Sequence, residues 1–310
     1  MSGPLRREFV VPAGEAGTRL DAFLAGRADI SRARAARFIA DAAALVDGAP
    51  ASKSLRVEAG MRVVVSLPAG NEEATPAPED TPIRVVYEDD HLLVVSKPAG
   101  LVVHPAPGHR SGTLVNALLA RTAAPPAGGD LARPGIVHRL DAGTSGLMIV
   151  AKDEPTHAAL TEALAARAIT RTYLALVEGA PDTDTATVDA PIGRSNRDRK
   201  KMAVVAGGRH AVTEIKVLER HADTSLVEAR PVTGRTHQIR VHLKAAGHPV
   251  VGDVVYGKNR KLAAALGLDR PFLHAARLSF EHPSTGARIE LDDPLPPDLA
   301  AALEAARTRP

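Results

Sequence analysis

The sequence contains no cysteine and no tryptophan, and it has only three tyrosines and five phenylalanines in 310 residues. The absence of cysteine excludes a disulfide scaffold, a thiolate zinc site, an iron–sulfur cluster and a cysteine nucleophile. The shortage of aromatic rings argues against a protein that holds single strands by stacking bases on rows of side chains. If a nucleic acid binds, arginine and lysine must therefore make most of the contacts.

Long apolar runs are also lacking. No run approaches the ~18–20 residues that a membrane-spanning helix needs, and the first ten residues contain no signal-peptide core. We therefore expect a soluble, cytoplasmic protein with no membrane partner. The net charge of +3, from 39 Lys and Arg against 36 Asp and Glu, is too small to identify a partner by itself.

An acidic, proline-rich segment divides the chain. Residues 68–82, PAGNEEATPAPEDTP, hold four prolines and four acidic residues but no large apolar side chain. Such a composition is typical of a semi-extended linker. The length of 310 residues also suits two domains. The sequence thus predicts a small N-terminal domain over residues 1–67 and a large domain over residues 83–310.

The small domain is expected to contain two helices followed by two short strands. The first helix opens at residues 18–21, and the second spans residues 31–45 with Ser31 as its N-cap. A turn at residues 45–48 and a strand at residues 60–65 follow. The second helix carries an apolar stripe at helical spacing and three arginines away from it: Ala35, Phe38, Ile39, Ala42 and Val46 against Arg32, Arg34 and Arg37.

Taken alone, these arginines form a solvated helix face. The whole pattern resembles the small α/β RNA-binding module shared by a small-subunit ribosomal protein, some tRNA synthetases and several RNA-modifying enzymes. That resemblance covers residues 18–66 and implies that the basic helix lies against RNA phosphates. Arg32, Arg34 and Arg37 are therefore candidate RNA-binding residues.

The large domain is expected to be rich in strands. Residues 83–87 and 91–95 form a predicted hairpin across an acidic turn. Because strands follow one another with few helices between them, we expect an α+β fold with a mixed, largely antiparallel sheet and flanking helices. The other predicted strands are 147–151, 172–177, 212–217, 225–230, 276–281 and 287–291, and the predicted helices are 113–121, 154–166 and 236–246.

Three motifs fall short of known sites. The segment 252–258 fits the front of a phosphate-binding loop, but Asn259 stands where serine or threonine must hold magnesium. The segment 143–146 is one residue short of a hydrolase nucleophile elbow. Neither His138 with Asp141 nor His237 with His242 has the spacing of a helical zinc site. We therefore expect no nucleotide cofactor and no metal.

The most informative segment is residues 135–153, GIVHRLDAGTSGLMIVAKD, in which a polar turn lies between two apolar runs. Asp141 heads this turn. A lone Asp-x-Gly most often caps a turn, but here Arg139 and the block 233–240, TGRTHQIR, supply basic groups. A partly buried carboxylate beside a cation stays ionised and is available as a nucleophile or base.

The segment His138-Arg-Leu-Asp141, with Thr144-Ser-Gly146, resembles the signature of the RluA-type pseudouridine synthases. Further blocks agree in order along the chain, so that the resemblance spans residues 83–296 and the layout is similar to RluD-like large-subunit rRNA enzymes. These blocks are 87–105, 151–152, 171–173, 191–193, 201–203, 234–240, 252–253 and 273–275.

The resemblance implies specific roles. Asp141 is the catalytic aspartate, Tyr173 packs on the target base, Arg235 is the basic partner of the aspartate, and Arg139 fills the stack that the base leaves. Without the family, Tyr173 could equally be an ordinary strand aromatic, and Arg235 a solvated arginine at a helix start. The implied reaction turns uridine into pseudouridine in RNA without a cofactor, after the base has left its stack.

Three chemical routes stay open for Asp141. The carboxylate attacks the anomeric carbon, attacks ring carbon 6, or assists removal of the 2′ proton. The sequence does not choose among them.

Basic residues cluster again at 194–201, where one acidic residue, Asp198, accompanies Arg194, Arg197, Arg199, Lys200 and Lys201. Alone, they indicate an exposed loop; beside an RNA cleft they indicate phosphate contacts. The expected partner is RNA, namely large-subunit rRNA or its assembling subunit. Two alternatives remain: a non-catalytic RNA-binding or ribosome-assembly factor on the same fold, and a metal-dependent hydrolase that uses the histidines.

Overall fold

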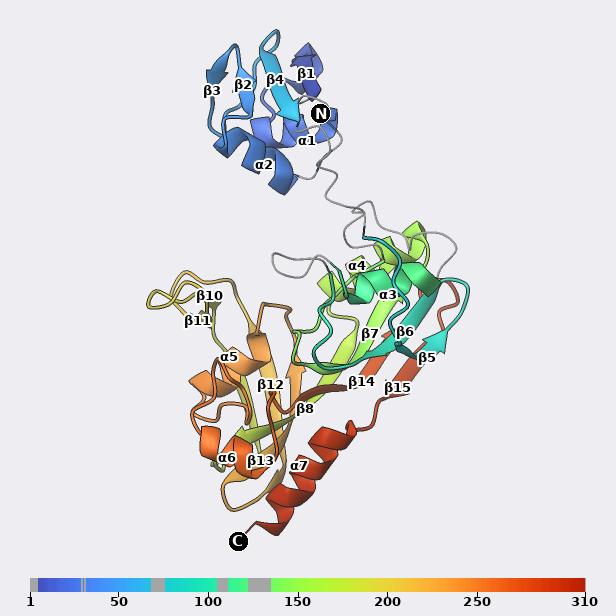
Figure 1. Cartoon of the computed structure of the whole chain (residues 1–310), viewed down its shortest axis with the longest axis vertical. Helices are drawn as coiled ribbons and strands as arrows, with labels where there is room; N and C mark the ends of the chain where they lie inside the picture. The colour runs from blue at the N-terminus through green and yellow to red at the C-terminus, as the bar shows by residue number, and fades with distance from the viewer. Residues whose placement is uncertain are drawn as a thin grey trace. The chain divides into compact units, whose positions relative to one another are not determined.

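The chain forms two units, each with a hydrophobic core of its own, in the computed structural model, which describes residues 5–28, 30, 32–67, 76–104, 111–121 and 135–309. Figure 1 shows the helices and strands of both units. One unit comprises Met1–Thr75 and the other Pro76–Pro310. The division falls inside the segment 68–82.

The first unit packs two helices on a small antiparallel sheet. The strands lie in the order β1-β4-β2-β3, and the helices share their core with β2 and β4. Side chains alternate along β4, because Val63 and Val65 are fully buried in the core shared with the helices, while Val64 between them points to the other face of the sheet. The elements are β1 (Leu5–Val10), α1 (Leu20–Ala28), α2 (Arg32–Ala40), β2 (Ala44–Val46), β3 (Ala49–Pro50) and β4 (Arg62–Leu67).

The second helix ends earlier than the sequence indicated. It stops at Ala40, because Ala42 adopts a left-handed conformation (φ 53°) and the chain then joins β4 as strand β2. The predicted end at residue 45 is therefore wrong. The apolar residues at 44–46 serve a strand instead of the last turn of a helix. The predicted N-cap, Ser31, lies outside the described residues.

The end of the predicted linker packs on the second unit. The Ala77 carbonyl accepts a hydrogen bond from the Asn116 side chain at 2.8 Å, and the Glu79 amide donates to the Asn116 carbonyl at 3.0 Å. A Glu79 carboxylate oxygen also accepts from the Gly112 amide. These polar contacts fix residues 76–82 on the second unit without any large apolar side chain. The rest of the segment, 68–75, lies outside the described residues.

The second unit is built on a mixed sheet of nine strands in the order β5-β6-β7-β14-β8-β13-β12-β9, with β15 on β14. Every pairing in it is antiparallel except that of β7 with β14, which confirms the predicted fold class. The strands are β5 (Arg84–Glu88), β6 (Leu92–Lys97), β7 (Ser145–Ala151), β8 (Thr170–Glu178), β9 (Thr185–Asp189), β12 (Val212–Arg220), β13 (Thr224–Pro231), β14 (Leu273–Glu281) and β15 (Arg288–Asp292).

Helices flank this sheet, and a separate hairpin extends away from it (Figure 1). The hairpin consists of β10 (Ile192–Arg194) and β11 (Met202–Val204). The helices are α3 (Leu114–Arg121), α4 (Glu154–Ala165), α5 (Gln238–Ala245), α6 (Arg260–Ala265) and α7 (Pro297–Thr308). Helix α7 was not predicted, although four buried residues recur in it at helical spacing: Leu299, Ala302, Leu303 and Ala306.

The parallel pairing at the centre of the sheet depends on a glycine. Gly146 lies opposite Ala275 and has a φ of 115°; an added Cβ would stand 2.4 Å from the Ala275 carbonyl oxygen. Only glycine allows this approach. As a result, the turn that carries Asp141 is held at the middle of the sheet, directly before β7.

Candidate active site

A pocket of about 430 Å³ lies where the turn before β7, strand β8, the end of β13 and the start of α5 meet. This volume suits a ligand the size of a nucleoside. Asp141, Tyr173, Arg139 and Arg235 all line it. The structure thus brings together four residues that come from three distant parts of the sequence.

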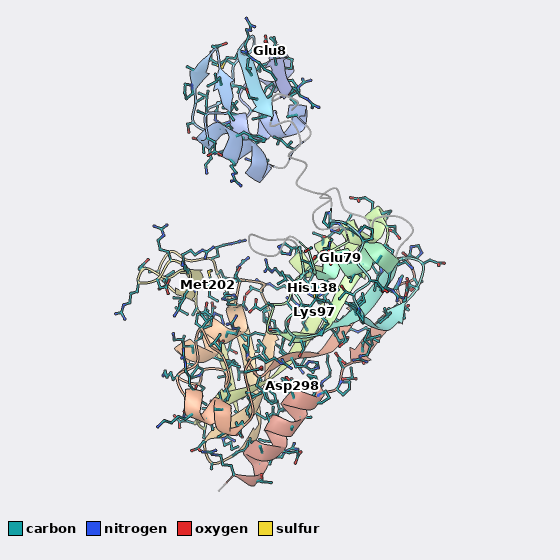
Figure 2. The ribbon with its side chains drawn as sticks, viewed as in Figure 1. Glu8, Glu79, Lys97, His138, Met202 and Asp298 are labelled. Atoms are coloured by element: carbon teal, nitrogen blue, oxygen red, sulfur yellow. The ribbon has the colours of Figure 1, made fainter. Side chains whose placement is uncertain are left out.

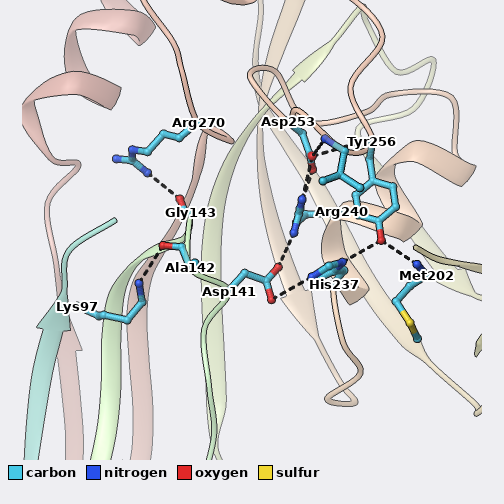
Figure 3. Close-up of polar contacts among 11 residues, drawn as sticks. Lys97, Asp141, Ala142, Gly143, Met202, His237, Arg240, Asp253, Tyr256 and Arg270 are labelled. Carbon is cyan, nitrogen blue, oxygen red and sulfur yellow. Dashed lines mark hydrogen bonds and ion pairs between the residues drawn. The ribbon is translucent and has the colours of Figure 1, made fainter. Parts of the chain in front are cut away.

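The turn that carries Asp141 is fixed by its backbone carbonyls (Figure 3). The buried Lys97 ammonium donates to the Ala142 carbonyl at 3.2 Å, and also to Pro98 and Leu101. Arg270 donates to the Gly143 carbonyl. Burial lowers the pKa of Lys97 to about 7, and the nearby Asp141 charge opposes that shift. With its carbonyls held from one side, the turn projects the Asp141 carboxylate into the pocket.

Arg240 is the cation that contacts Asp141. Its Nη1 donates to Asp141 Oδ2 at 2.9 Å, while Nε and Nη2 donate to the two oxygens of the buried Asp253. Burial by itself lowers the pKa of the Arg240 guanidinium, but Asp253 and then Asp141 outweigh it and raise the pKa above its ordinary value. The guanidinium is therefore permanently charged and geometrically fixed by a bidentate pair.

The expectation that Arg235 partners Asp141 is corrected by this geometry. Arg235 lies in the turn before α5, where its amide donates to the Gln238 side chain and its Nε donates to the His210 carbonyl. Burial lowers the pKa of Arg235. Arg240 lies inside α5 and is 6% exposed. One feature of the sequence could have indicated Arg240 as the partner of Asp141. His237 and Arg240 are three residues apart on a predicted helix, and residues at this spacing share a helix face.

Tyr173 lies on β8, paired with Ala229 of β13 and Ala275 of β14, and is 6% exposed. Burial raises the pKa of its phenol, Arg171 opposes this, and the Asp141 charge adds to the rise. The hydroxyl is therefore protonated at neutral pH. Its ring forms part of the wall of the pocket.

The histidines that suggested a metal are occupied by hydrogen bonds. His138 Nε2 accepts from the Ile149 amide, and burial lowers the pKa of His138 to about 3. His242 contacts Thr213 through Nδ1 and the Ala190 carbonyl through Nε2. Among the residues that the structure describes, no group of three or more metal-binding side chains is placed to hold an ion.

The segment 143–146, which is one residue short of a nucleophile elbow, also has a structural role. Ser145 Oγ lies 3.0 Å from His274 Nδ1, and His274 Nε2 donates to the Asp293 carbonyl. All three residues are at most 4% exposed, so no substrate reaches this serine. The cluster ties the start of β7 to β14.

Comparison with known proteins places this site in a family. The family model for RNA pseudouridylate synthases matches residues 91–245. The chain belongs to this family. It is 45% identical to the ribosomal large subunit pseudouridine synthase D of Xanthomonas campestris over 97% of this chain and 92% of that protein.

Two further similarities agree. The synthase D of Zymomonas mobilis is 48% identical over 75% of this chain and 74% of its own length. The solved structure of human RNA Pseudouridylate Synthase Domain Containing 1 superposes with a TM-score of 0.58 at 28% identity, over 75% of this chain and 97% of that one. The protein is therefore an RNA pseudouridine synthase.

Four residues of the polar network that leads to Asp141 were not predicted as site residues from the sequence: His237, Arg240, Asp253 and Tyr256. His237 Nε2 lies 3.9 Å from Asp141 Oδ1, and its Nδ1 lies 2.8 Å from the Tyr256 hydroxyl. The blocks 233–240 and 252–253 were noticed as motifs. Their side-chain directions could be read only from the folded chain.

The basic cluster of the synthase forms the β10–β11 hairpin. Arg194, Arg197, Arg199 and Lys200 are exposed there, while Lys201 is half-buried and 3.8 Å from Asp198. In Figure 2 the side chains of this hairpin extend from the region of Met202 into solvent. The hairpin thus presents positive charge on a projecting element.

The N-terminal arginines differ in their surroundings. Arg32 lies 3.1 Å from the nearly buried Asp21, which Arg19 also contacts. Arg37 is largely exposed beside Asp41. The side chain of Arg34 lies outside the described residues. RNA binding by these arginines stays a prediction.

No helix in the described parts of the chain is long and apolar enough to cross a membrane. The cytoplasmic location stays a prediction.

Proposed function

We propose that this synthase converts specific uridines of large-subunit ribosomal RNA into pseudouridine and that Asp141 is the reacting carboxylate. The observation that carries the proposal is the arrangement of Asp141, which points into a nucleoside-sized pocket with one oxygen held by the buried Arg240. The relatives named ribosomal large subunit pseudouridine synthase D support the choice of substrate.

The enzyme must reach the glycosidic N1–C1′ bond of the target uridine, which is inaccessible while the base is stacked in the RNA. The target base leaves its stack at a cost of about a few kcal/mol and enters the pocket, and Arg139, which is exposed at the rim, fills the space left in the RNA. The N1–C1′ bond breaks, the uracil rotates against Tyr173, and a C5–C1′ bond forms. C5 loses its proton and N1 gains one, so the product is an isomer.

Asp141 serves each of the three routes as an ionised carboxylate next to the sugar. Arg240 stabilises that charge and fixes the direction of Oδ2, so the group needs little reorganisation when the bond breaks. Tyr173 confines the free uracil. Arg235 is proposed to contact the RNA from the pocket wall, since it lines the pocket while its Nε donates to the His210 carbonyl.

RNA is held by positive charge outside the pocket. We assign phosphate contacts to Arg197, Arg199, Lys200 and Lys201 of the hairpin, and to Arg32, Arg34 and Arg37 of the N-terminal unit as an RNA-binding module. Phosphate contacts position the RNA without reading its sequence.

The test compares Asp141→Asn with Asp269→Asn, a matched change at an exposed position of the same unit. Each variant is incubated with large-subunit rRNA transcripts, and pseudouridine is mapped by carbodiimide modification and primer extension. We expect Asp141→Asn to form no pseudouridine while its RNA affinity stays within about twofold, and Asp269→Asn to behave as wild type.

Two results would contradict the proposal. Pseudouridine formation by Asp141→Asn removes Asp141 from the chemistry. An unmodified rRNA profile with wild-type protein that still binds the RNA favours the alternative of a non-catalytic assembly factor.

A further inference from the structure

A hydrogen-bonded chain of three groups reaches Asp141 from the side opposite the Asp141 turn (Figure 3). The Met202 amide, on the basic hairpin, donates to the Tyr256 hydroxyl at 3.0 Å. The Tyr256 oxygen lies 2.8 Å from His237 Nδ1, and His237 Nε2 lies 3.9 Å from Asp141 Oδ1. Arg240 contacts only the other oxygen, Oδ2.

The direction of the protons along this chain follows from charge. Burial lowers the pKa of His237, with the Asp141 charge opposing it, so the ring is neutral at neutral pH and carries one N–H. If that proton were on Nδ1, the lone pair of Nε2 would face the negatively charged Asp141. A proton on Nε2 faces Asp141 favourably instead, and Nδ1 then accepts a hydrogen bond from the Tyr256 hydroxyl.

Tyr256 is held well enough to orient the histidine. The residue is 2% exposed, and its ring lies under the Arg240 guanidinium at 4.9 Å and packs edge-on against His237. His237 itself precedes α5 with a φ of 56°, a left-handed conformation that few residue types adopt readily. The fold therefore maintains an unfavourable backbone conformation at the residue that faces Asp141.

We propose that Tyr256 and His237 are positioning residues, which direct an Nε2–H group toward Asp141 Oδ1 while Arg240 holds Oδ2. The inference rests on the proposed function, since it assigns a role in that reaction to the His237 and Tyr256 side chains near the reacting carboxylate. Because the same Tyr256 oxygen accepts from Met202, it also fixes the base of the basic hairpin to the active site.

The kinetic test uses three variants. Tyr256→Phe keeps the ring and removes only the hydroxyl. His237→Asn keeps a residue type that tolerates the left-handed conformation but is too short to bridge Tyr256 and Asp141. The double variant combines them. Tyr87→Phe is the matched control, because it also removes a single hydrogen-bonded phenol hydroxyl, in this case one that donates to Asp89 outside the pocket.

We expect His237→Asn to lower kcat about 10-fold with KM changed less than about 3-fold, because the reacting carboxylate loses one polar contact that orients it. Tyr256→Phe should lower kcat similarly and raise KM, since Met202 also loses its acceptor. The double variant should match the worse single variant in kcat, because both changes interrupt one path. Tyr87→Phe should leave kcat unchanged.

An unchanged kcat in His237→Asn, or losses that multiply in the double variant, would overturn the proposal. A second measurement needs no activity. Long-range ¹H–¹⁵N correlation of histidine-labelled protein should show His237 as the Nε2–H tautomer, with the His237→Asn spectrum identifying its signals. A clear Nδ1–H tautomer would refute the proposed direction, whereas failure of wild-type protein to modify rRNA refutes the proposed function instead.

Discussion

Arg240 binds two carboxylates at once, and this double role decides how its loss should be interpreted. Asp253 is fully buried and accepts two hydrogen bonds from the guanidinium, while Asp141 is partly open to the pocket. A buried ion pair contributes modestly compared with an apolar replacement, but removing one partner leaves a buried charge uncompensated. Arg240 is thus required for stability as well as for the orientation of Asp141.

Arg240→Met is therefore expected to lower the free energy of unfolding by about 3–5 kcal/mol, because the Asp253 charge would lose its partner. Chemical denaturation followed by circular dichroism measures this. Arg121→Met is the control, since Arg121 makes an exposed pair with Glu88 and should cost at most about 1 kcal/mol. Equal losses in both variants would show that the Arg240 pairs contribute no more than a surface ion pair.

At the scale of elements, turns and close approaches hold the sheet together around the site. The turn between β5 and β6 is organised by Asp89, whose carboxylate accepts from the amides of His91 and Leu92 and from the Tyr87 hydroxyl, and also contacts His282 of the strand region after β14. Partial burial raises the pKa of Asp89, but these hydrogen bonds outweigh it and hold the pKa at about 2.

This shift predicts a pH dependence of stability. The folded pKa of about 2 lies below the ordinary value of 3.8, so the stabilisation is complete above about pH 4 and is lost as the pH falls toward 2. Asp89→Asn should remove on the order of 1–2 kcal/mol at pH 7 and flatten the loss between pH 4 and 2. Unfolding free energies over this range measure it; parallel curves for the two proteins would contradict it.

The close approach of β7 to β14 gives a second prediction. Gly146→Ala should destabilise the second unit by about 3 kcal/mol or more, because its Cβ would overlap the Ala275 backbone, and it should displace the Asp141 turn. Gly267→Ala isolates the effect of backbone strain, since Gly267 also has a positive φ but open space around it; we expect about 1 kcal/mol there. Thermal unfolding and pseudouridine mapping are the measurements.

At the scale of the whole molecule, exposed basic residues also cluster on elements that do not line the pocket. The small net charge of +3 conceals a projecting hairpin with four exposed basic residues, and the first unit exposes Arg37 on its second helix. Binding that depends on phosphate contacts releases counterions and weakens as salt increases. The pocket and the RNA-binding surfaces can therefore be separated by experiment.

Lys200→Ala with Lys201→Ala should weaken RNA binding at all sequences and reduce the slope of log affinity against log salt by about 1–2, with kcat at saturating RNA nearly unchanged. Lys258→Ala with Lys261→Ala, at exposed positions of the same unit, provides a charge-matched control. Filter binding from low to high salt measures the slope. An unaltered slope would remove the hairpin from the RNA interface.

Strong local patterns in the sequence determined much of the fold of this protein. Alternating apolar residues, turn residues and the acidic segment were enough to predict the α+β class, the β5–β6 hairpin and helices α3, α4 and α5 within a few residues. The residues around Asp141 and Tyr173 were found because they lie in long motifs. Short exposed strands such as β9 have no buried face, so their sequences lack the alternation of apolar and polar residues that predicts a strand.

Only the tertiary structure decided which arginine meets Asp141. Arg235 and Arg240 lie five residues apart in one motif, and the sequence does not state where α5 begins or which way each side chain points. The left-handed His237 and the hydrogen bond that the Arg235 amide donates to the Gln238 side chain set that start, and the buried Asp253 then fixes Arg240. A carboxylate's partner is chosen by three-dimensional distance and burial, which depend on contacts between segments far apart in the chain.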